Sequence, residues 1–370
     1  MCSDTPSFNK VLLYEPGKTG HRPVILRYLV QHLPDFGWQP VVCDDQKYSR
    51  LSSSDLDALD LIAKANGCSL VHILTIDGCA RRWVFPRKIL KSERLPLIGS
   101  YYLFSNLTNF RGFIWLWILW LGYFDRLLIS DPYIPKRFVL PELVGRVSYV
   151  PDPWSKKEFI FHSKYDARQK LNLPENDLLV LVFGEISQRK GIQRILSALR
   201  IISCSTLKII FAGRVASDAT DDIEAFYSDK KHSNKIILIN RFIEEKEVAM
   251  LFCAADAVLS DYPKNFKVSS GAFTRALVAK SIPIVPDHGV LSEWVKQNRF
   301  GLTYLSESPV HLAAVLDELP LKIKIKDSLF CIENCEIESD SREASNYAKN
   351  VTIGYENALL SRTSISTTYV

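Results

Sequence analysis

The fold is decided by the stretch FKVSSGAFTRALVAKSIPIVP, which occupies residues 266–286 of the 370-residue chain. Ser269 and Ser270 are good helix N-cap residues, Gly271 lets another backbone approach closely, and apolar residues then recur at helical spacing. The stretch therefore predicts a helix over 272–280 and an apolar strand that begins at 284. Such a helix start presents unpaired N–H groups and the positive end of the helix dipole, which favour an anion. Taken alone, however, Ser-Ser-Gly more often marks nothing beyond a capped helix.

A second glycine-containing loop lies upstream of this stretch. A continuous apolar strand is predicted at 178–183, and the sequence GEISQRKG follows it at 184–191, before a helix predicted at 192–200. Lys190, close to that helix start, is suited to reach a phosphate as a mobile point charge, and Arg189 beside it can add a second charge. A lone Lys-Gly pair carries no such meaning. Its occurrence together with the Ser-Ser-Gly stretch favours an anion site built from both loops.

The order of these elements resembles the C-terminal nucleotide-binding domain of retaining glycosyltransferases of family 4, in the subgroup with a Ser-Ser-Gly donor loop. The resemblance covers residues 150–304 well and the N-terminal half loosely. It implies the α/β GT-B fold, with two Rossmann-like doubly wound parallel-sheet domains facing a central cleft. It also implies transfer of a sugar from a nucleotide diphosphate sugar to a glycan or lipid-linked acceptor. Retention of anomeric configuration and no metal or other cofactor are expected.

The same resemblance divides the chain. Residues 1–150 are expected to form the acceptor-binding domain, with strands at 10–14, 38–43, 70–74, 97–102 and 126–130. The stiff sequence Pro151-Asp152-Pro153 predicts the junction. Residues 151–340 are then the nucleotide-sugar-binding domain. A terminal helix at 341–360 is expected to return to the first domain, and residues 361–370, rich in Ser and Thr, to form a loose tail.

Residue roles follow from the resemblance where the motifs match. Lys190, with Arg189, is expected to stabilise the departing diphosphate, a task for fixed positive charge and N–H donors. The donor-binding residues are expected to be Gly184, Phe242, Ile243, Ser269, Ser270, Gly271, Thr274 and His288.

The acceptor side is predicted from the first strand–loop–helix unit of the chain. A Gly-containing loop at 15–22 follows the strand, and doubly wound sheets place ligand-binding backbone at such loops. Gly20 and Arg22 are therefore acceptor-side candidates, and His21 is a candidate catalytic residue. The alternative is that His21 and Arg22 only cap the helix or face solvent.

The sequence departs from the family pattern at several positions. Many relatives carry two glutamates eight positions apart, the second binding the ribose hydroxyls, whereas this chain has Lys267 and Arg275 there. Glu185 stands where an arginine is usual, and no histidine lies between His72 and His162. These departures keep a second hypothesis open, namely a catalytically silent GT-B-like protein that serves as a binding or scaffold partner.

Composition sets outer limits on function. The chain is 47% hydrophobic and 24% charged, which is ordinary for a globular protein of two domains. Its net charge of +5 is modest for this length and argues against a dedicated nucleic-acid binder. The eight cysteines show no metal-ligand spacing, and the N-terminus shows no signal segment. A cytoplasmic protein is expected, with a peripheral position on the inner face of the membrane as a variant.

Two segments favour that membrane variant. Basic residues alternate with apolar ones at 79–94, a composition that suits an anionic bilayer surface but also a surface helix with a buried side. The candidate membrane-contacting residues are Arg81, Arg82, Trp83, Arg87 and Lys88. A charge-free run at 113–124 with Trp115, Trp117 and Trp120 is too short to span a bilayer. It is therefore expected either to be buried in the protein core or to lie at the membrane interface.

Overall fold

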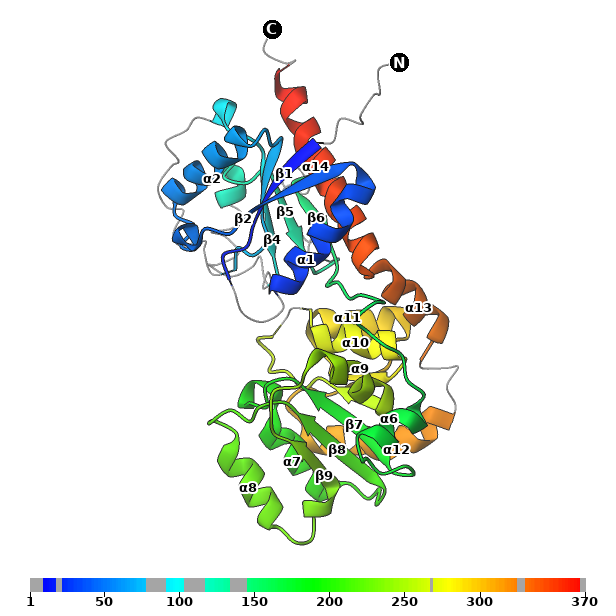
Figure 1. Cartoon of the computed structure of the whole chain (residues 1–370). Helices are drawn as coiled ribbons and strands as arrows, with labels where there is room; N and C mark the ends of the chain where they lie inside the picture. The colour runs from blue at the N-terminus through cyan, green and yellow to red at the C-terminus, as the bar shows by residue number, and fades with distance from the viewer. Residues whose placement is uncertain are drawn as a thin grey trace. The chain divides into compact units, whose positions relative to one another are not determined.

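The computed structural model describes residues 9–17, 22–77, 91–102, 117–133, 145–266, 269–324 and 330–366. The chain forms two compact units. The N-terminal unit comprises Met1–Pro153 together with Ala344–Val370, and the C-terminal unit is Trp154–Glu343. Each unit is a parallel sheet with helices around it (Figure 1).

The sheet of the N-terminal unit has six parallel strands in the order β2-β1-β3-β4-β5-β6. The strands are β1 (Asn9–Tyr14), β2 (Trp38–Cys43), β3 (Leu70–Ile73), β4 (Leu97–Tyr101), β5 (Arg126–Ile129) and β6 (Val147–Tyr149). The helices of this unit include α1 (Arg22–His32), α2 (Ser53–Ala65) and α14 (Ala344–Ser366).

Both faces of this sheet are buried, as a doubly wound fold requires. Along β1, Val11 and Leu13 pack in one core cluster with α1 and α14, whereas Leu12 and Tyr14 pack in another with α2. Because successive strand residues point to opposite faces, the uninterrupted apolar run of β1 supplies both clusters at once. The helix α2 begins at a capping box, in which Ser52 and Asp55 bind each other's backbone N–H.

The helix α14 belongs to the N-terminal unit although it follows the other unit in sequence. It contacts α1 and β5, and Tyr347, Val351 and Tyr355 are fully buried there. The expectation of a loose tail from residue 361 needs correction. The helix continues to Ser366, and Arg362 lies against Asp125 with Nε 2.6 Å from a carboxylate oxygen. This ion pair holds the first turn of the segment that composition alone predicts to be loose.

A buried histidine connects α14 to the sheet. The dependence of stability on acid pH tests whether this histidine is buried. His72 on β3 lies 2.7 Å from the Tyr355 hydroxyl and 2.8 Å from the Ser100 hydroxyl. Burial lowers the pKa of His72 to about 3. Between about pH 6.5 and 3 the unfolded chain therefore binds a proton that the folded chain does not, so stability falls as the pH falls.

The expected result is a steeper loss of unfolding free energy in the wild type than in His72→Gln, by about 1.4 kcal/mol per pH unit between pH 6 and 4. Urea unfolding at a series of pH values measures both slopes. Equal slopes in the two proteins would show that His72 is not buried as a neutral ring.

The sheet of the C-terminal unit also has six parallel strands, in the order β12-β11-β10-β7-β8-β9. The strands are β7 (Leu178–Phe183), β8 (Leu207–Ala212), β9 (Ile236–Ile239), β10 (Ala257–Leu259), β11 (Ile282–Pro286) and β12 (Leu302–Tyr304). The helices are α6 (Lys164–Lys170), α7 (Ile192–Ile201), α8 (Thr220–Ser228), α9 (Glu245–Ala254), α10 (Gly271–Ala279), α11 (Gly289–Asn298), α12 (Pro309–Lys324) and α13 (Ile332–Ser341).

Two buried arginines of the C-terminal unit are paired with carboxylates. Arg168 on α6 donates to a carboxylate oxygen of Asp256 at 2.7 Å and to the Ala254 carbonyl at 3.0 Å. Arg342, which has no exposed surface, binds Glu338 at 2.6 Å and lies over the Trp294 ring at 4.6 Å. Because a buried charge without a partner is costly, these pairs fix the helices to which they belong.

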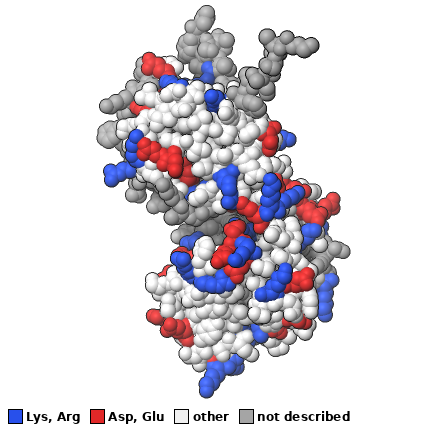
Figure 2. Space-filling view, viewed as in Figure 1, with Lys and Arg blue, Asp and Glu red and all other residues white. Residues whose placement is uncertain are grey.

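The surface shows no single-sign field on the side visible in Figure 2. Acidic and basic side chains of the described residues are interspersed there. That pattern accords with the net charge of +5 and is unlike the basic face of a nucleic-acid-binding domain.

The run at 113–124 is half buried where the structure describes it. Ile118 and Leu119 are in the core, whereas Trp117 and Trp120 are 53% and 62% exposed. Among the described residues, no helix is long and apolar enough to cross a bilayer.

Candidate functional site

The strand order of the C-terminal unit predicts where a ligand binds. Counted within the unit, the order is 3-2-1-4-5-6, and the order reverses between β7 and its neighbour β10. Ligands of open α/β sheets bind beyond the carboxyl ends of the strands at such a reversal. Here the chain leaves β7 at Gly184 and β10 at Ser260. The two loops singled out from the sequence therefore meet at one edge of the sheet.

Lys190 is the buried cation of this edge. It ends the short 3₁₀ helix Gln188–Lys190, and its Nζ donates to the carbonyl oxygen of Phe183. A Cβ placed on Gly184 would lie 3.0 Å from that Nζ, so the ammonium lies directly over Gly184. Burial, with a smaller contribution from neighbouring Arg189, lowers the pKa of Lys190 to about 8. The ammonium is thus desolvated and gains most from an anionic partner.

Gly184 and Gly191 both adopt backbone conformations that favour glycine, with φ values of 95° and 64°. Gly191 also lacks room for a side chain, because a Cβ there would overlap the carboxylate of Asp261. Asp261 is buried and accepts from Arg194 Nε at 2.9 Å. The Lys-Gly pair thus starts α7 with its backbone pressed against a buried ion pair.

The helix α10 begins without a side-chain cap from its N-cap residue. Ser270 is the N-cap residue but makes no cap hydrogen bond; its hydroxyl lies 3.0 Å from the Tyr262 hydroxyl. The rings of Tyr262 and Phe266 stack with centroids 3.8 Å apart. Since the first N–H groups of a helix have no partner within it, the amides of Gly271, Ala272 and Phe273 are the candidates to bind a ligand here.

Two donor-site predictions need restating from the structure. Thr274 is buried, and its Oγ1 accepts from Arg342 at 3.0 Å, so this hydroxyl is engaged inside the unit and does not face a ligand. Thr274 lies one helical turn after Ser270, which is why it was expected to reach the phosphate. In the structure this face of α10 points into the unit. His288, the N-cap residue of α11, lies 2.5 Å from the Ser306 hydroxyl and 2.9 Å from the Pro263 carbonyl. Both ring nitrogens are therefore engaged within the unit.

An exposed aromatic ring lies after β9. Phe242 is 67% exposed, and the guanidinium of Arg214 lies 5.6 Å from its ring centroid. The next residue, Ile243, is buried in the core. Phe242 thus offers a flat apolar face, supported by a cation, of the kind on which a nucleobase stacks.

The residues that depart from the family pattern, and Arg189 near them, differ in their surroundings. Glu185 and Arg189 are exposed, and the Arg189 guanidinium lies 5.9 Å from the Tyr262 ring centroid. Arg275 on α10 lies with Nη1 3.4 Å from the Gly271 carbonyl oxygen. Lys267 lies outside the described residues.

The N-terminal unit has a comparable sheet edge, where β1 and β3 are neighbours at the reversal of its strand order. Glu15 is buried there, accepting from the Thr75 hydroxyl at 2.7 Å and the Gly17 amide at 2.8 Å. Burial raises the pKa of Glu15. Arg22, one of the predicted acceptor-side residues, lies against Gly17 at this edge.

Glu15 and Thr75 were missed from the sequence, although both directly follow apolar strands and that position was the available signal. The predicted Gly20 and His21 lie outside the described residues. So do all five membrane candidates, Arg81, Arg82, Trp83, Arg87 and Lys88.

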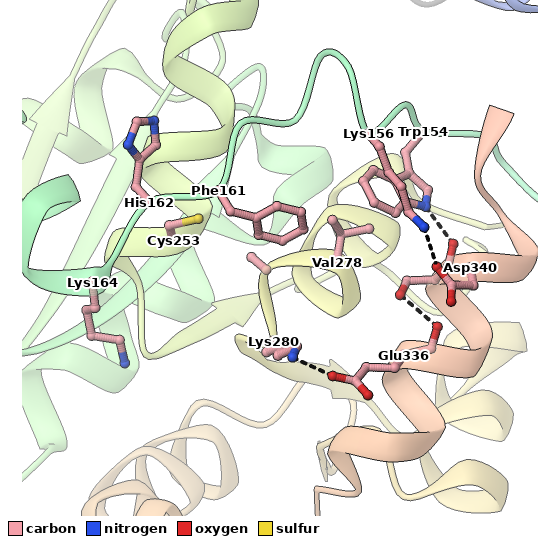
Figure 3. Close-up of a pocket in the computed structure, with 12 residues that line it drawn as sticks. Trp154, Lys156, Phe161, His162, Lys164, Cys253, Val278, Lys280, Glu336 and Asp340 are labelled. Carbon is pink, nitrogen blue, oxygen red and sulfur yellow. Dashed lines mark hydrogen bonds and ion pairs between the residues drawn. The ribbon is translucent and has the colours of Figure 1, made fainter.

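A cavity in the described part of the C-terminal unit lies elsewhere. It has a volume of about 610 Å³ and is lined by Phe161, Val278 and Lys280 among others. Figure 3 shows Phe161 beside Val278, and Lys280 paired with Glu336 on α13. Val278 and Lys280 are at the C-terminal end of α10, whereas Gly271 begins it. A helix of this length spans about 13 Å, so the cavity is separate from the sheet edge that carries Lys190.

Comparisons with known proteins agree with this architecture. No protein-family model and no curated protein sequence matches the chain. Solved structures do match it. Sucrose-phosphate synthase from Thermosynechococcus elongatus aligns with TM-score 0.69 at 15% identity, covering 95% of this chain and 100% of that one. A glycosyltransferase from Rickettsia africae aligns with TM-score 0.72 at 11% identity, covering 95% and 98%.

A third similar structure, HepE from Anabaena in complex with UDP, aligns with TM-score 0.69 at 12% identity, covering 94% of this chain and all of that one. At such identities the likeness concerns the fold. Two six-stranded parallel sheets with flanking helices, matched over nearly the whole of each chain, confirm the expected fold: this chain has the GT-B fold of these structures.

Proposed function

We propose that this protein transfers a glycosyl group from a nucleoside diphosphate sugar, with retention of configuration, to a glycan or lipid-linked acceptor. The observation that carries the proposal is the edge between β7 and β10, where buried Lys190 and the uncapped start of α10 lie together. A departing diphosphate needs fixed positive charge and N–H donors, and this edge offers both without a metal. The support from relatives is that HepE binds UDP and UDP-glucose.

In this proposal each described group has one task. Lys190 holds the diphosphate oxygens, with Arg189 as an exposed second cation. The amides of Gly271 and its neighbours in α10 bind the same phosphate. Phe242 stacks on the base. Glu15, at the sheet edge of the other unit, is a carboxylate suited to bind or activate an acceptor hydroxyl.

A thermal-shift screen tests the donor site. UDP, GDP, ADP and their common sugar conjugates are compared with the corresponding nucleosides. One diphosphate at about 100 times its dissociation constant should add about 2.7 kcal/mol of stability, a shift of some degrees. The matching nucleoside should add little, because it lacks the phosphates. No response to any nucleotide would favour the alternative, a catalytically silent GT-B-like protein that binds another partner. The replacement of both glutamates by Lys267 and Arg275 supports that alternative.

The buried ammonium predicts a pH dependence of donor binding. Only protonated Lys190 attracts the diphosphate, and its pKa in the free protein is about 8. As the pH rises above 8, binding must also return a proton to the amine, so the dissociation constant should rise toward tenfold per pH unit. Lys190→Arg should bind with a nearly flat profile to pH 9.5, because a guanidinium keeps its charge. Calorimetric titration at pH 7, 8, 9 and 9.5 measures this, and a flat wild-type profile would exclude Lys190 as the phosphate ligand.

The lipid-linked variant of the acceptor implies contact with a membrane surface. Trp117 and Trp120 are exposed, with ring centroids 5.4 Å apart, and tryptophan favours the interface of a bilayer. Flotation with anionic liposomes should weaken several-fold in the double variant Trp117→Ala/Trp120→Ala. It should also weaken in the variant with Arg81, Arg82, Arg87 and Lys88 changed to glutamate. Phe161→Ala, which removes an exposed aromatic ring from the other unit, is the matched control. Unchanged flotation in both variants would remove the membrane from the proposal.

A further inference from the structure

Arg275 on α10 lies between the starts of two helices, α10 and α9. It is the fifth residue of α10, and its side chain folds back along the helix, with Nη1 3.4 Å from the Gly271 carbonyl oxygen. A Cβ on Gly271 would lie 3.1 Å from the same nitrogen. Residues four apart share one helix face, so the guanidinium lies beside the first residue of α10, at its phosphate-binding end.

The other neighbour of Arg275 belongs to the base-binding side. Its Nη2 lies 3.6 Å from a carboxylate oxygen of Glu245. Glu245 begins α9, directly after the loop that carries Phe242. Arg275 thus reaches from the start of α10 to the start of α9. If a nucleoside diphosphate binds with its phosphates at the start of α10 and its base on Phe242, its ribose and the phosphate nearest to the ribose would pass near this guanidinium.

The chemistry of the Arg275 side chain decides which ligand groups it can bind. A guanidinium carries five N–H donors and no acceptor, and its planar fork matches phosphate oxygens. Two ribose hydroxyls are best bound by an acceptor that takes both protons, such as a carboxylate, whereas a phosphate is best bound by a charged donor pair. Arg275 is about one-third exposed, and its ion pair with Glu245 is long, so the guanidinium can turn to a ligand.

Resting on the proposed function, we infer that Arg275 sets nucleotide specificity: it binds the phosphate nearest the ribose, and the site does not read the ribose hydroxyls. The donor is selected by its phosphates and its base. A 2′-deoxynucleotide is therefore bound nearly as well as its ribonucleotide, and the positive charge of Arg275 contributes to the affinity of both.

Isothermal titration of the full chain tests this with UDP, GDP and ADP, each against its 2′-deoxy counterpart. In the wild type, the two members of the bound pair should differ by less than about threefold. Arg275→Glu should weaken both by about tenfold to 100-fold, the range for a charged hydrogen bond, and should shift the preference toward the ribonucleotide. Arg275→Gln should weaken both without that shift. Arg200→Glu, which reverses the charge of an arginine on α7, should leave both affinities within about twofold.

The outcomes separate the inference from the proposed function. A wild-type preference of more than about tenfold for the ribonucleotide, or an Arg275→Glu protein with unchanged affinity for the diphosphate, overturns the role of Arg275 and leaves the donor site standing. Failure of the folded wild type to bind any nucleotide overturns both. Circular dichroism of each variant establishes that its fold is retained.

Discussion

Replacing Lys190 by alanine should weaken nucleotide-diphosphate binding and slow turnover while leaving the protein folded. The ammonium is the buried charge at the anion-binding edge, lying over Gly184 and bound to a single carbonyl oxygen. Loss of a charged hydrogen bond to the diphosphate should cost about tenfold to 100-fold in affinity. The loss in turnover should be larger, about 100-fold to 1,000-fold, because negative charge grows on the leaving phosphate during the reaction.

Two variants control this experiment. Lys190→Arg keeps the charge and should retain part of the affinity. Lys246→Ala removes an exposed lysine of the same unit, whose side chain is 75% accessible, and should bind like the wild type. Differential scanning fluorimetry with the bound diphosphate measures all three. A Lys190→Ala protein that is stabilised as much as the wild type would place the phosphate elsewhere.

Replacing Gly191 by valine should strongly destabilise the C-terminal unit. The residue has a φ of 64°, which costs a β-branched side chain at least about 1–2 kcal/mol. Its new Cβ would also overlap the carboxylate of Asp261, which is buried in its pair with Arg194. Breaking a buried ion pair costs about 3–5 kcal/mol, so a total loss of more than about 4 kcal/mol is expected.

Substitutions at two other glycines distinguish the cost of the backbone conformation from the cost of the overlap with Asp261. Gly37 has a positive φ but open space around it, so Gly37→Ala measures the backbone term alone. Gly145 has open space and no positive φ, so Gly145→Ala should be near neutral. Urea unfolding of the three variants gives the comparison. A Gly191→Val protein no less stable than Gly37→Ala would mean that Asp261 does not press against this turn.

The strands were predictable because most are buried on both faces and read as continuous apolar runs. The predicted strand at 178–183 is β7, and that at 10–14 lies within β1. The order of the strands was not visible in the sequence. Pairing in the structure showed that β7 and β10 are neighbours.

The site was predictable only where a motif has a local cause. Lys190 and Gly191 follow a strand and begin a helix, so the backbone places them at the sheet edge whatever the rest of the chain does. The surroundings of Thr274 could not be predicted, because its partner Arg342 is distant in sequence. The neighbours of Arg275 depend in the same way on Glu245, thirty positions away.

Hydrogen–deuterium exchange of the full chain, with and without the stabilising nucleoside diphosphate, tests the central claim most directly. If the donor binds at the edge between β7 and β10, amides should be protected in peptides covering 184–192 and 269–276, which contain Lys190 and the start of α10. Peptides covering 154–164 and α13, which line the large cavity, should exchange unchanged. Protection confined to the cavity peptides, or absent from the whole C-terminal unit, would contradict the account.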